Sequence, residues 1–596
     1  MKKERLEKYL PPMLFVVSSL ILLYKCFYSF CWSDETFYFS TAYRFLQGDS
    51  IFKHDWFPTQ LSSLILLPFF YIYILISGQT TGILLYFRIL FVIFSTLNAL
   101  VSFLLLKKST GSFTAMAYAL CIMFYTHLNI ATLSYYTIST QCFLLTMVLI
   151  YSYTKSERKR NYLFYAGISY ALSVLALPTM AVGYLLTVIT LLLLLLYKKL
   201  MPQGPFSSCI DKELLLDILK YTLAGIVIPA IFFFIFLYSN VSISDFIRSI
   251  PYVLSDDEHG TSFIYPLKKF FIGINESFAI YAYLYYLLIL ICFSFRRILI
   301  RDKGPLVVLT LDLLLFIPCL TKVIPHTGYI FTLIALFSLP LFFMTKKPDL
   351  PAFFIIFIQG LIFSLVYSYS SNGYLYILSM GHFIASAAAF IFIKDFLWEL
   401  KELIGDEKGS LLQKLPSILL FTLFTVTCLT TITLRLTNIY RDAPMHKLTE
   451  RISDGPAKGL YTTKEHLRKY ETVLDTINNY CKKDSLKVCK NETLLLSKLL
   501  PFGYLYSDLK VAAPTTWRNK MDSERLMEYY ELNPDRFPDV VLILNKEYGS
   551  YDSCGDVESD PIPNENSLKG ELMDILNSDK YERIECECGI IYRLCP

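Results

Sequence analysis

The chain has 596 residues, of which 54% are hydrophobic and 18% are charged, and its mean hydropathy is +0.47. This composition excludes a soluble globular protein of this length, because its many apolar runs of about 18 to 25 residues have the length of membrane-spanning helices. The formal net charge of +5 is small, and the basic residues gather beside the apolar runs. That placement indicates membrane topology and excludes a nucleic-acid partner.

The first apolar run follows the basic sequence MKKERLEKYL and has no small-residue cleavage site after it. We therefore expect a retained helix with the N-terminus in the cytoplasm. About thirteen spans are predicted in total. They are 11–31, 82–106, 112–131, 137–153, 161–177, 179–197, 219–238, 276–295, 304–321, 326–344, 351–369, 373–393 and 415–435.

One further apolar stretch, 58–77, is not counted as a crossing. If it stays on the outer side, the basic clusters that follow it, from Lys107-Lys108 to Lys414, all fall in the cytoplasm. If it crosses, they all fall outside, against the positive-inside rule. Parity therefore predicts that 58–77 is re-entrant or lies along the outer surface; the alternative is a true crossing with one span miscounted elsewhere.

Two domains are predicted. Residues 1–436 form the α-helical polytopic membrane domain, with outer loops 32–81 and 239–275, and residues 437–596 form an extracytoplasmic domain. The second region is long enough for a small folded unit, and its hydrophobicity drops while its charge rises.

The C-terminal region shows alternating strand and helix patterns. The run 540–544 predicts a buried strand, 583–593 a terminal strand pair, and 492–504 a helix. This alternation predicts an α/β fold. An even number of cysteines lies in the region, and in an oxidising compartment we expect disulfides among them. They are Cys481, Cys489, Cys554, Cys586, Cys588 and Cys595.

The first polar segment after the first span begins with an acidic pair, Asp34-Glu35. Ser33 is a candidate cap for a helix whose first turn holds both carboxylates, and Gly48 is expected to close it. The apolar and polar residues of this helix fall on opposite sides, which predicts a helix lying flat on the bilayer surface. A carboxylate there can act as a general base on an acceptor hydroxyl, or hold Mg²⁺ or Mn²⁺ against a phosphate.

This segment resembles the GT-C class of membrane glycosyltransferases, within it the protein O-mannosyltransferase and aminoarabinose-transferase group. The resemblance covers about the first 200 residues, and beyond them only the architecture. It is carried by the acidic pair after the first span and by motifs that follow in the same order. These are Ala42-Tyr-Arg-Phe-Leu-Gln-Gly-Asp49, the proline-led stretch 58–77, Gly82 and Arg88 at the next span, and Lys107-Lys108.

The resemblance implies that Asp34 is the catalytic acid, with Glu35 as its neighbour. It further implies a sugar donor on a polyprenyl phosphate, attack at the anomeric carbon with inversion, and departure of the lipid phosphate. Many members of the group carry a second acid in the next outer loop. The corresponding residues here, Thr132–Ile138, contain no carboxylate.

Four cationic or ionisable residues at the outer side are candidates to bind the donor phosphate. Arg88 lies within a span, Lys322 and His326 flank a short outer turn, and Arg248 lies in the second outer loop. For each of them, contact with lipid head groups is the alternative.

The second outer loop also contains an acidic cluster with a histidine. Asp256, Asp257 and His259 are candidates to orient the acceptor or to hold a metal ion, although a charged loop is most often only solvated. The sequence does not decide whether a divalent cation such as Mg²⁺ or Mn²⁺ is a cofactor.

The resulting hypothesis is a multi-pass enzyme of the cell membrane that transfers a hexosyl or pentosyl group from a polyprenyl-phosphate donor to an extracytoplasmic protein, glycolipid or wall polymer. The alternative is a transporter or flippase of a lipid-linked saccharide, which predicts internal repeats with broken helices in corresponding halves. No such repeat is evident in the sequence.

Overall fold

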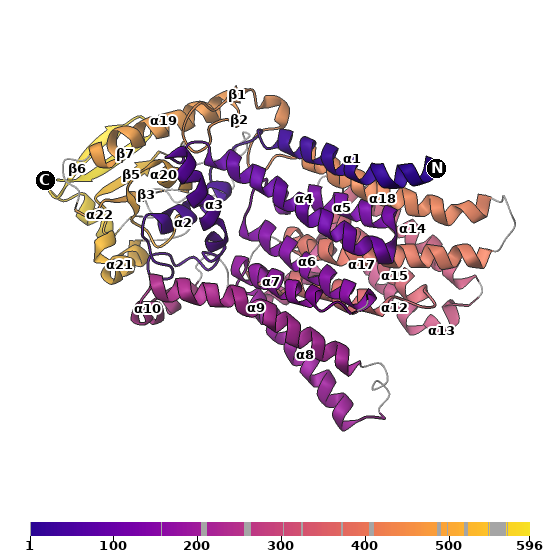
Figure 1. The fold of residues 1–596 in the computed structure, drawn as a ribbon. Coiled ribbons are helices and arrows are strands. Elements are labelled where there is room, and N and C mark those ends of the chain that lie inside the picture. The colour runs from indigo at the N-terminus through magenta and orange to yellow at the C-terminus, as the bar shows by residue number, and fades with distance from the viewer. Residues whose placement is uncertain are drawn as a thin grey trace.

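The computed structural model describes residues 2–156, 158–203, 211–255, 264–301, 303–323, 326–370, 374–404, 411–485, 490–497, 499–517, 523–545, 548, 568 and 570–595. Its helices form a long bundle, and a smaller domain with a β-sheet, built from the last part of the chain, lies at one end of it (Figure 1).

Each of the expected spans coincides with a helix of the bundle. These helices are α1 (Lys2–Lys25), α4 (Ile83–Thr110), α5 (Ser112–Phe124), α6 (Tyr135–Lys155), α7 (Asn161–Ala176), α8 (Met180–Leu200), α9 (Lys212–Asn240), α12 (Ile280–Ser294), α14 (Gly304–Val323), α15 (Tyr329–Met344), α16 (Ile358–Tyr367), α17 (Tyr374–Ile404) and α18 (Leu411–Thr437). A π-helical turn at Ala352–Phe357 leads into α16. Helices outside this set are α2 (Asp34–Leu46), α3 (Ser62–Ser77), α10 (Ile243–Leu254), α11 (Tyr265–Phe278) and the short α13 (Arg296–Leu299).

In the described chain, six helices are long and apolar enough to cross a membrane: α4, α8, α9, α14, α17 and α18. A seventh candidate is the pair α11–α12, which bends by 114° at Ala279. The apolar parts of α1, α5, α15 and α16 are shorter. A membrane protein that is mostly helical is thus confirmed, whereas the number of about thirteen crossings is not.

Helices α1 and α4 run antiparallel, side by side. The hydroxyls of Ser19 and Thr96 are 3.1 Å apart near the middle of the pair, and Arg88, near the start of α4, donates to the carbonyl of Cys26, just past the end of α1, at 2.8 Å. The chain therefore leaves and re-enters the bundle at the same end, and the whole of 26–82 lies between these two points. This arrangement supports the parity argument that 58–77 makes no net crossing.

Helix α3, which covers most of 58–77, is followed by contacts with the C-terminal domain. The hydroxyl of Thr80 donates to the carbonyl of Leu505 at 2.6 Å, and the amide of Gly82 donates to the carbonyl of Gly455 at 3.0 Å. The end of α3 and the start of α4 thus lie against the C-terminal domain, at the left of the bundle in Figure 1.

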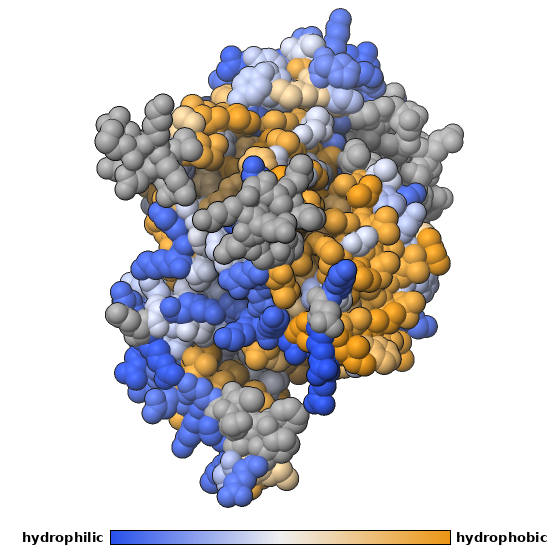
Figure 2. Space-filling view, turned by 90° about the vertical axis from the view of Figure 1, so that its right-hand side faces the viewer, coloured by the Kyte–Doolittle hydropathy of each residue, from blue (hydrophilic) through white to orange (hydrophobic). Residues whose placement is uncertain are grey.

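The basic clusters gather at the opposite end of the bundle. Arg296 donates to the carbonyl of Thr345 at 2.8 Å, and Lys155 forms an ion pair with Asp349 at 2.8 Å. Figure 2 looks onto this end: hydrophilic residues gather at its top, left and lower edge, and a broad hydrophobic surface covers the right. The basic clusters lie at one end of the bundle, as expected if successive spans run in alternating directions.

The C-terminal domain contains a five-stranded sheet in the order β4-β3-β5-β7-β6. Strand β3 (Thr493–Leu496) pairs in parallel with β4 (Lys510–Val511) and β5 (Val540–Leu544), and β7 (Gly589–Leu594) pairs antiparallel with β5 and β6 (Tyr581–Cys586). The other elements of the domain are α19 (Lys464–Tyr480), α20 (Pro501–Tyr506), α21 (Ser523–Leu532), α22 (Glu571–Leu576), β1 (Glu450–Arg451) and β2 (Tyr461–Thr462).

The strands predicted at 540–544 and 583–593 are present, and the α/β arrangement is confirmed. The helix predicted over 492–504 is wrong in its first half. All four residues of β3 are buried, and a short apolar run inside a sheet has no polar face for helical periodicity to reveal.

The expected disulfides are not found in the part of the chain that the structure describes. Cys481, Cys586, Cys588 and Cys595 are free thiols, and the sulfurs of Cys586 and Cys588, on either side of the tight turn between β6 and β7, are 3.9 Å apart. The remaining two tail cysteines, Cys489 and Cys554, lie outside the described residues.

Helix α2 lies between the bundle and the C-terminal domain, not on the bilayer surface. The polar side of α2 is buried. Arg44, on this side, forms ion pairs with Asp49 at 2.6 Å and Asp55 at 3.1 Å and donates to the carbonyl of Ala513. Arg536 of the C-terminal domain binds the second oxygen of Asp49 at 2.8 Å. Amphipathic periodicity is the same for a helix on a membrane and for one whose polar side meets a buried ion network, and this explains the wrong prediction.

Candidate functional site

Asp34 and Glu35 form the first turn of α2, directly after the connection from α1. Both are buried, with 8% and 4% of their surface exposed. Carboxylates in a first turn are favoured by the positive end of the helix dipole. Ser33 precedes them but does not cap the helix with its side chain; instead its hydroxyl accepts a hydrogen bond from Arg441 at 2.6 Å. Gly48, with φ of +93°, follows the end of α2 as expected.

The carboxylate of Asp34 is bound by residues that follow the last membrane helix, α18, in the sequence. One oxygen lies 2.6 Å from a guanidinium nitrogen of Arg441 and accepts a hydrogen bond from the hydroxyl of Tyr440 at 2.9 Å. Burial and the negative charge of Asp34 raise the pKa of Tyr440 well above its ordinary value, so this phenol stays protonated and donates. The side chain of Arg441 is 27% exposed, so the ion pair lies near the protein surface on this side.

Arg441 sits in a strained backbone conformation that lets three consecutive residues point at the N-terminal loop. Its φ is +51°, in the left-handed region. The next residue, Asp442, accepts from the amide of Phe30 at 2.7 Å and contacts His466 of α19 at 3.0 Å. Tyr440-Arg441-Asp442, which we name the clip, therefore joins the Asp34 loop to the C-terminal domain.

Glu35 is paired with Arg88 in a two-pronged ion pair. Nε and a terminal nitrogen of Arg88 lie 2.5 and 2.6 Å from the two carboxylate oxygens. The remaining donors of Arg88 reach the carbonyls of Cys26 and Tyr28 and the hydroxyl of Ser29. The sequence predicts phosphate binding by Arg88, but its donors are occupied here, and it holds Glu35 and the end of α1 in place.

Two more cations are buried beside this pair. Arg435, near the end of α18, is 3% exposed and donates to Thr126, Asn129 and Ile130, all neutral oxygens, while its Nε has no acceptor among the described residues. Lys25 is 6% exposed and donates to the carbonyl of Leu436 at 3.0 Å.

In the described part of the chain neither Arg435 nor Lys25 forms an ion pair with a carboxylate. Lys25, Arg88 and Arg435 lie close enough to act on one another electrostatically, and Glu35 acts on Arg435 and is paired with Arg88. Buried cations without a counter-ion are costly, and ionisable groups within membrane helices often line substrate or ion pathways.

A small cavity lies between these groups, with about 260 Å³ of space including its open mouth. Its walls are Glu35 and Arg88, Ser29 and Cys31 from the loop after α1, Tyr440 of the clip, and residues 129–131. Asp34 is one residue from this wall and reaches it through its hydrogen bond with Tyr440. The cavity thus joins an acid, a phenol and the guanidinium of Arg88, and Arg435 binds two of its wall residues, Asn129 and Ile130.

The other predicted site residues are spread over the same end of the bundle. His326 bonds to the hydroxyl of Tyr376 at 3.0 Å, and its neighbour Thr327 accepts from Asn438, just before the clip. Lys322 and Arg248 are exposed and are not among the residues that line the cavity.

Asp256, Asp257 and His259 lie outside the described residues, so their predicted role stays a prediction. Among the described residues, no three His, Cys, Asp or Glu side chains are grouped so that they would hold a metal ion. Asp34 and Glu35 are each already bound to an arginine.

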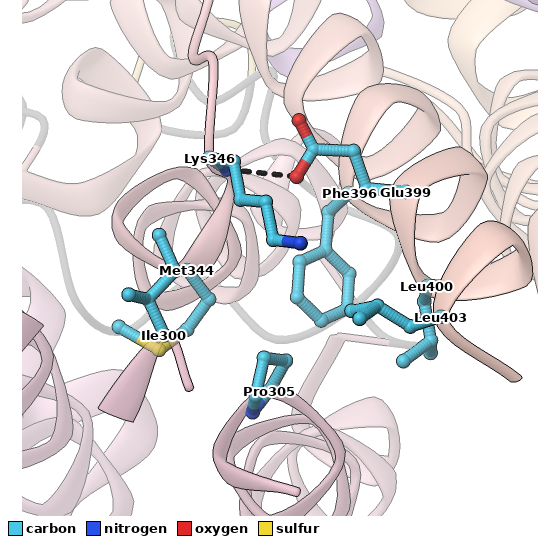
Figure 3. A pocket seen from close by; sticks show the side chains of 8 residues that line it. All are labelled: Ile300, Pro305, Met344, Lys346, Phe396, Glu399, Leu400 and Leu403. Atoms are coloured by element: carbon cyan, nitrogen blue, oxygen red, sulfur yellow. Dashed lines mark hydrogen bonds between the residues drawn. The ribbon is translucent and has the colours of Figure 1, made fainter. Parts of the chain in front are cut away.

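A second small pocket lies at the basic end of the bundle (Figure 3). Its walls are mostly apolar, and the carboxylate of Glu399 accepts the backbone amide of Lys346 at 2.7 Å. This acid caps a chain reversal, and the pocket combines no acid with a cationic cluster as the first one does.

Sequence reasoning missed Lys25, Arg435, Tyr440 and Arg441. Lys25 and Arg435 lie in the last turns of helices, where basic residues are ordinary. The clip lies just past the last span, in what reads as a linker. The one signal that the sequence offered was the group of charges directly after 415–435.

The sequence matches no known protein family, and no curated protein matches it. Solved structures are similar over most of the chain. The archaeal oligosaccharyltransferase AglB from Archaeoglobus fulgidus, in complex with an inhibitory peptide and a dolichol-phosphate, has 12% identity and a TM-score of 0.48, with 99% of this chain and 75% of that chain covered.

Two further structures are of the oligosaccharyltransferase from the same organism. The apo form has 12% identity and a TM-score of 0.47, over 90% of this chain and 70% of that chain. The complex with Zn and sulfate has 12% identity and a TM-score of 0.46, over 89% and 67%. At this identity and these TM-scores, the likeness assigns neither a family nor an activity to this chain.

Proposed function

We propose that this protein is an inverting glycosyltransferase that moves a sugar from a polyprenyl-phosphate donor to an acceptor at the outer face of a cell membrane. The observation that carries the proposal is the position of Asp34: a carboxylate in the first turn of α2, one residue from a cavity beside buried cations that lack a counter-ion among the described residues. This combination provides a base and an anion site within one small region.

In this mechanism the lipid phosphate of the donor binds the side chains of Arg435 and Lys25. As the bond to the sugar breaks, negative charge develops on the phosphate, and fixed cations in a water-poor site stabilise it strongly. Arg435 is pre-positioned for this, because its guanidinium is already held by Asn129 and by backbone carbonyls. Arg248, Lys322 and His326 are proposed to guide the anionic head group toward this site from the outer surface.

Asp34 accepts the proton of the acceptor hydroxyl as that oxygen attacks the anomeric carbon. Arg441 orients the carboxylate, and its partial exposure provides the direction from which an acceptor approaches. Glu35 is a positioning residue that works through Arg88. Asp256, Asp257 and His259 stay candidates for acceptor contacts or for holding a divalent cation such as Mg²⁺ or Mn²⁺.

In this proposal residues 1–436 carry the donor site, and residues 437–596 complete it through the clip and cover it from the outer side. The N-terminus and the basic end of the bundle lie in the cytoplasm, and the C-terminal domain lies outside.

Binding of bare polyprenyl phosphate tests the anion site. Arg435→Gln in the full-length protein is expected to weaken this binding about tenfold or more, because a charge-assisted contact to phosphate is lost. Lys108→Gln, at the basic end of the bundle, is the matched control and should leave it unchanged. Equal effects of both variants would refute the anion site.

Incubation of the purified protein with radiolabelled polyprenyl-phosphate sugars tests the reaction. The proposal predicts transfer to an acceptor, or slow hydrolysis of the donor in its absence. Movement of the intact lipid-linked sugar across a vesicle bilayer, without either product, would favour the alternative of a flippase.

A further inference from the structure

A cluster of aromatic residues adjoins Asp34. The ring of Tyr38, on α2, lies 5.4 Å from Tyr135, which lies 4.1 Å from Tyr136. The ring of Tyr136 in turn packs against His127 at 4.5 Å and Tyr367, at the end of α16, at 5.7 Å. These five residues, which we name the tyrosine cluster, join three separate helices and the turn after α5.

Four polar atoms in and beside this cluster are buried without a hydrogen-bond partner among the described residues: Oη of Tyr38, Oη of Tyr367, Nδ1 of His127 and Oγ1 of Thr132. Their residues are 2%, 0%, 5% and 0% exposed. Buried polar groups in folded proteins nearly always have a partner, and leaving one without a partner costs free energy. Four in and beside one cluster indicate that a polar ligand completes the site.

The cluster is next to the cavity. Tyr38 lies within electrostatic range of Asp34, Tyr440 and Cys31, and the last two line the cavity wall. Thr132 directly follows Ala131, which lines it as well. A group bound against the tyrosine cluster would therefore lie beside both Asp34 and the buried cations.

The cluster is uncharged. Asp34 is the carboxylate that acts on Tyr38 and Tyr440, and it is already paired with Arg441. Within the described chain, no charged side chain acts on His127 or Tyr367. A cationic amino sugar would find no unpaired carboxylate here, whereas a neutral sugar offers hydroxyls to the four partnerless atoms and C–H faces to the tyrosine rings.

We propose that the tyrosine cluster, with Thr132, is the subsite for the transferred sugar, and that it selects a neutral polyhydroxylated sugar over an amino sugar. This inference rests on the proposed function, and it goes beyond it by naming the class of sugar and the residues that bind it. Tyr38 and His127 hydrogen-bond the sugar hydroxyls, and the rings of Tyr135 and Tyr136 pack against its faces.

The test is binding of three lipids to the full-length protein in nanodiscs: polyprenyl-phosphate mannose, polyprenyl-phosphate aminoarabinose and bare polyprenyl phosphate. Tyr38→Phe removes one hydroxyl and keeps the ring. It is expected to weaken binding of the mannose lipid about three- to tenfold and to leave binding of bare polyprenyl phosphate within twofold. Thr132→Val should behave in the same way. The wild type should bind the aminoarabinose lipid no more tightly than the bare carrier.

Tyr285→Phe is the matched control, because Tyr285 on α12 is also a buried phenol without a partner among the described residues but lies outside the cluster. It should change none of the three affinities. Equal losses for mannose lipid and bare carrier in Tyr38→Phe, or aminoarabinose lipid bound as tightly as mannose lipid, would overturn the sugar subsite.

The two proposals fail separately. Transfer that depends on Asp34 together with unchanged mannose-lipid binding in Tyr38→Phe and Thr132→Val refutes the subsite and keeps the function. Mannose-lipid binding that depends on Tyr38, with no transfer from any donor, keeps the subsite and refutes the transferase.

Discussion

Arg441 binds Asp34 at 2.6 Å, although the two residues are about 400 positions apart in the sequence and lie on either side of the membrane helices α4 to α18. Asp34 opens the helix after α1, and Arg441 follows the end of α18. The candidate base, Asp34, therefore gains its contact with Arg441 only when the last helix and the C-terminal domain have docked. The left-handed backbone of Arg441 indicates that the surrounding contacts enforce this geometry.

Arg441 variants test whether its charge serves the reaction. Asn tolerates the left-handed backbone, so Arg441→Asn removes the cation with little backbone penalty. We expect turnover to fall about 10- to 100-fold, because Asp34 loses the contact that orients its carboxylate.

Arg441→Lys is the matched variant, since it keeps a positive charge at the same position. It should retain most of the turnover. Turnover of Arg441→Asn at the wild-type rate would limit Arg441 to a structural role.

The Glu35–Arg88 pair should dominate the stability of the loop after α1. Removing one partner of a buried ion pair leaves a desolvated charge and costs about 3–5 kcal/mol. Glu35→Gln and Arg88→Gln should each lower the free energy of unfolding by about that amount, measured with denaturant in one detergent. The double variant should lose much less than the sum of both.

The control for that pair is Glu585→Gln, which breaks the exposed contact with Arg583 at 2.9 Å. Exposed pairs contribute about 0–1 kcal/mol. If Glu35→Gln were as mild as this control, the buried pair would not hold the loop.

His54 makes the docking of the outer loop onto the C-terminal domain sensitive to acid. Burial, followed by the charge of Arg536, lowers the pKa of His54 from 6.5 to about 3. The folded state thus favours the neutral ring, so the stability it contributes is complete above pH 6.5 and is lost as the pH falls. Between pH 6.5 and 5 the loss is about 2 kcal/mol.

Thermal unfolding of the wild type and His54→Gln across this pH range measures the effect. Burial raises the pKa of Asp55 from 3.8 to about 6, which has the opposite sign: its contribution is lost as the pH rises from 3.8 to 6. Because both proteins contain Asp55, their difference isolates His54. Parallel pH dependences in the two proteins would exclude the histidine as the cause.

The path of 58–77 is testable with reporter fusions. The antiparallel contact of α1 and α4 places Gln79 at the end of the bundle that bears the C-terminal domain and Lys107 at the other. A reporter after Gln79 should be active on the outer side, and one before Lys107 on the cytoplasmic side. The same result at both positions would mean that the helix between them does not cross.

The helical membrane architecture was predictable because each span leaves its own local signal, an apolar run followed by basic residues at alternate ends. Asp34 and Glu35 could be singled out for the same reason, since an acid pair next to a span is visible within a few residues. Arg88 was noted as unusual, but its pairing with Glu35 was not predictable, because a sequence does not show which charges meet.

The burial of α2 and the roles of Arg435 and the clip were not predictable. Each depends on contacts between segments hundreds of residues apart, such as Asn129 with Arg435 and Asp34 with Tyr440. Strand β3 was missed on other grounds: its four apolar residues fit a helix and a buried strand equally well.

The most direct test of the account is the turnover of Asp34→Asn with a radiolabelled polyprenyl-phosphate hexose, compared with Asp245→Asn, an acid of α10 at the same end of the protein whose side chain is 33% exposed. The account predicts that Asp34→Asn abolishes transfer while still folding and still binding bare polyprenyl phosphate, and that Asp245→Asn transfers at the wild-type rate. Turnover of Asp34→Asn at the wild-type rate would contradict it.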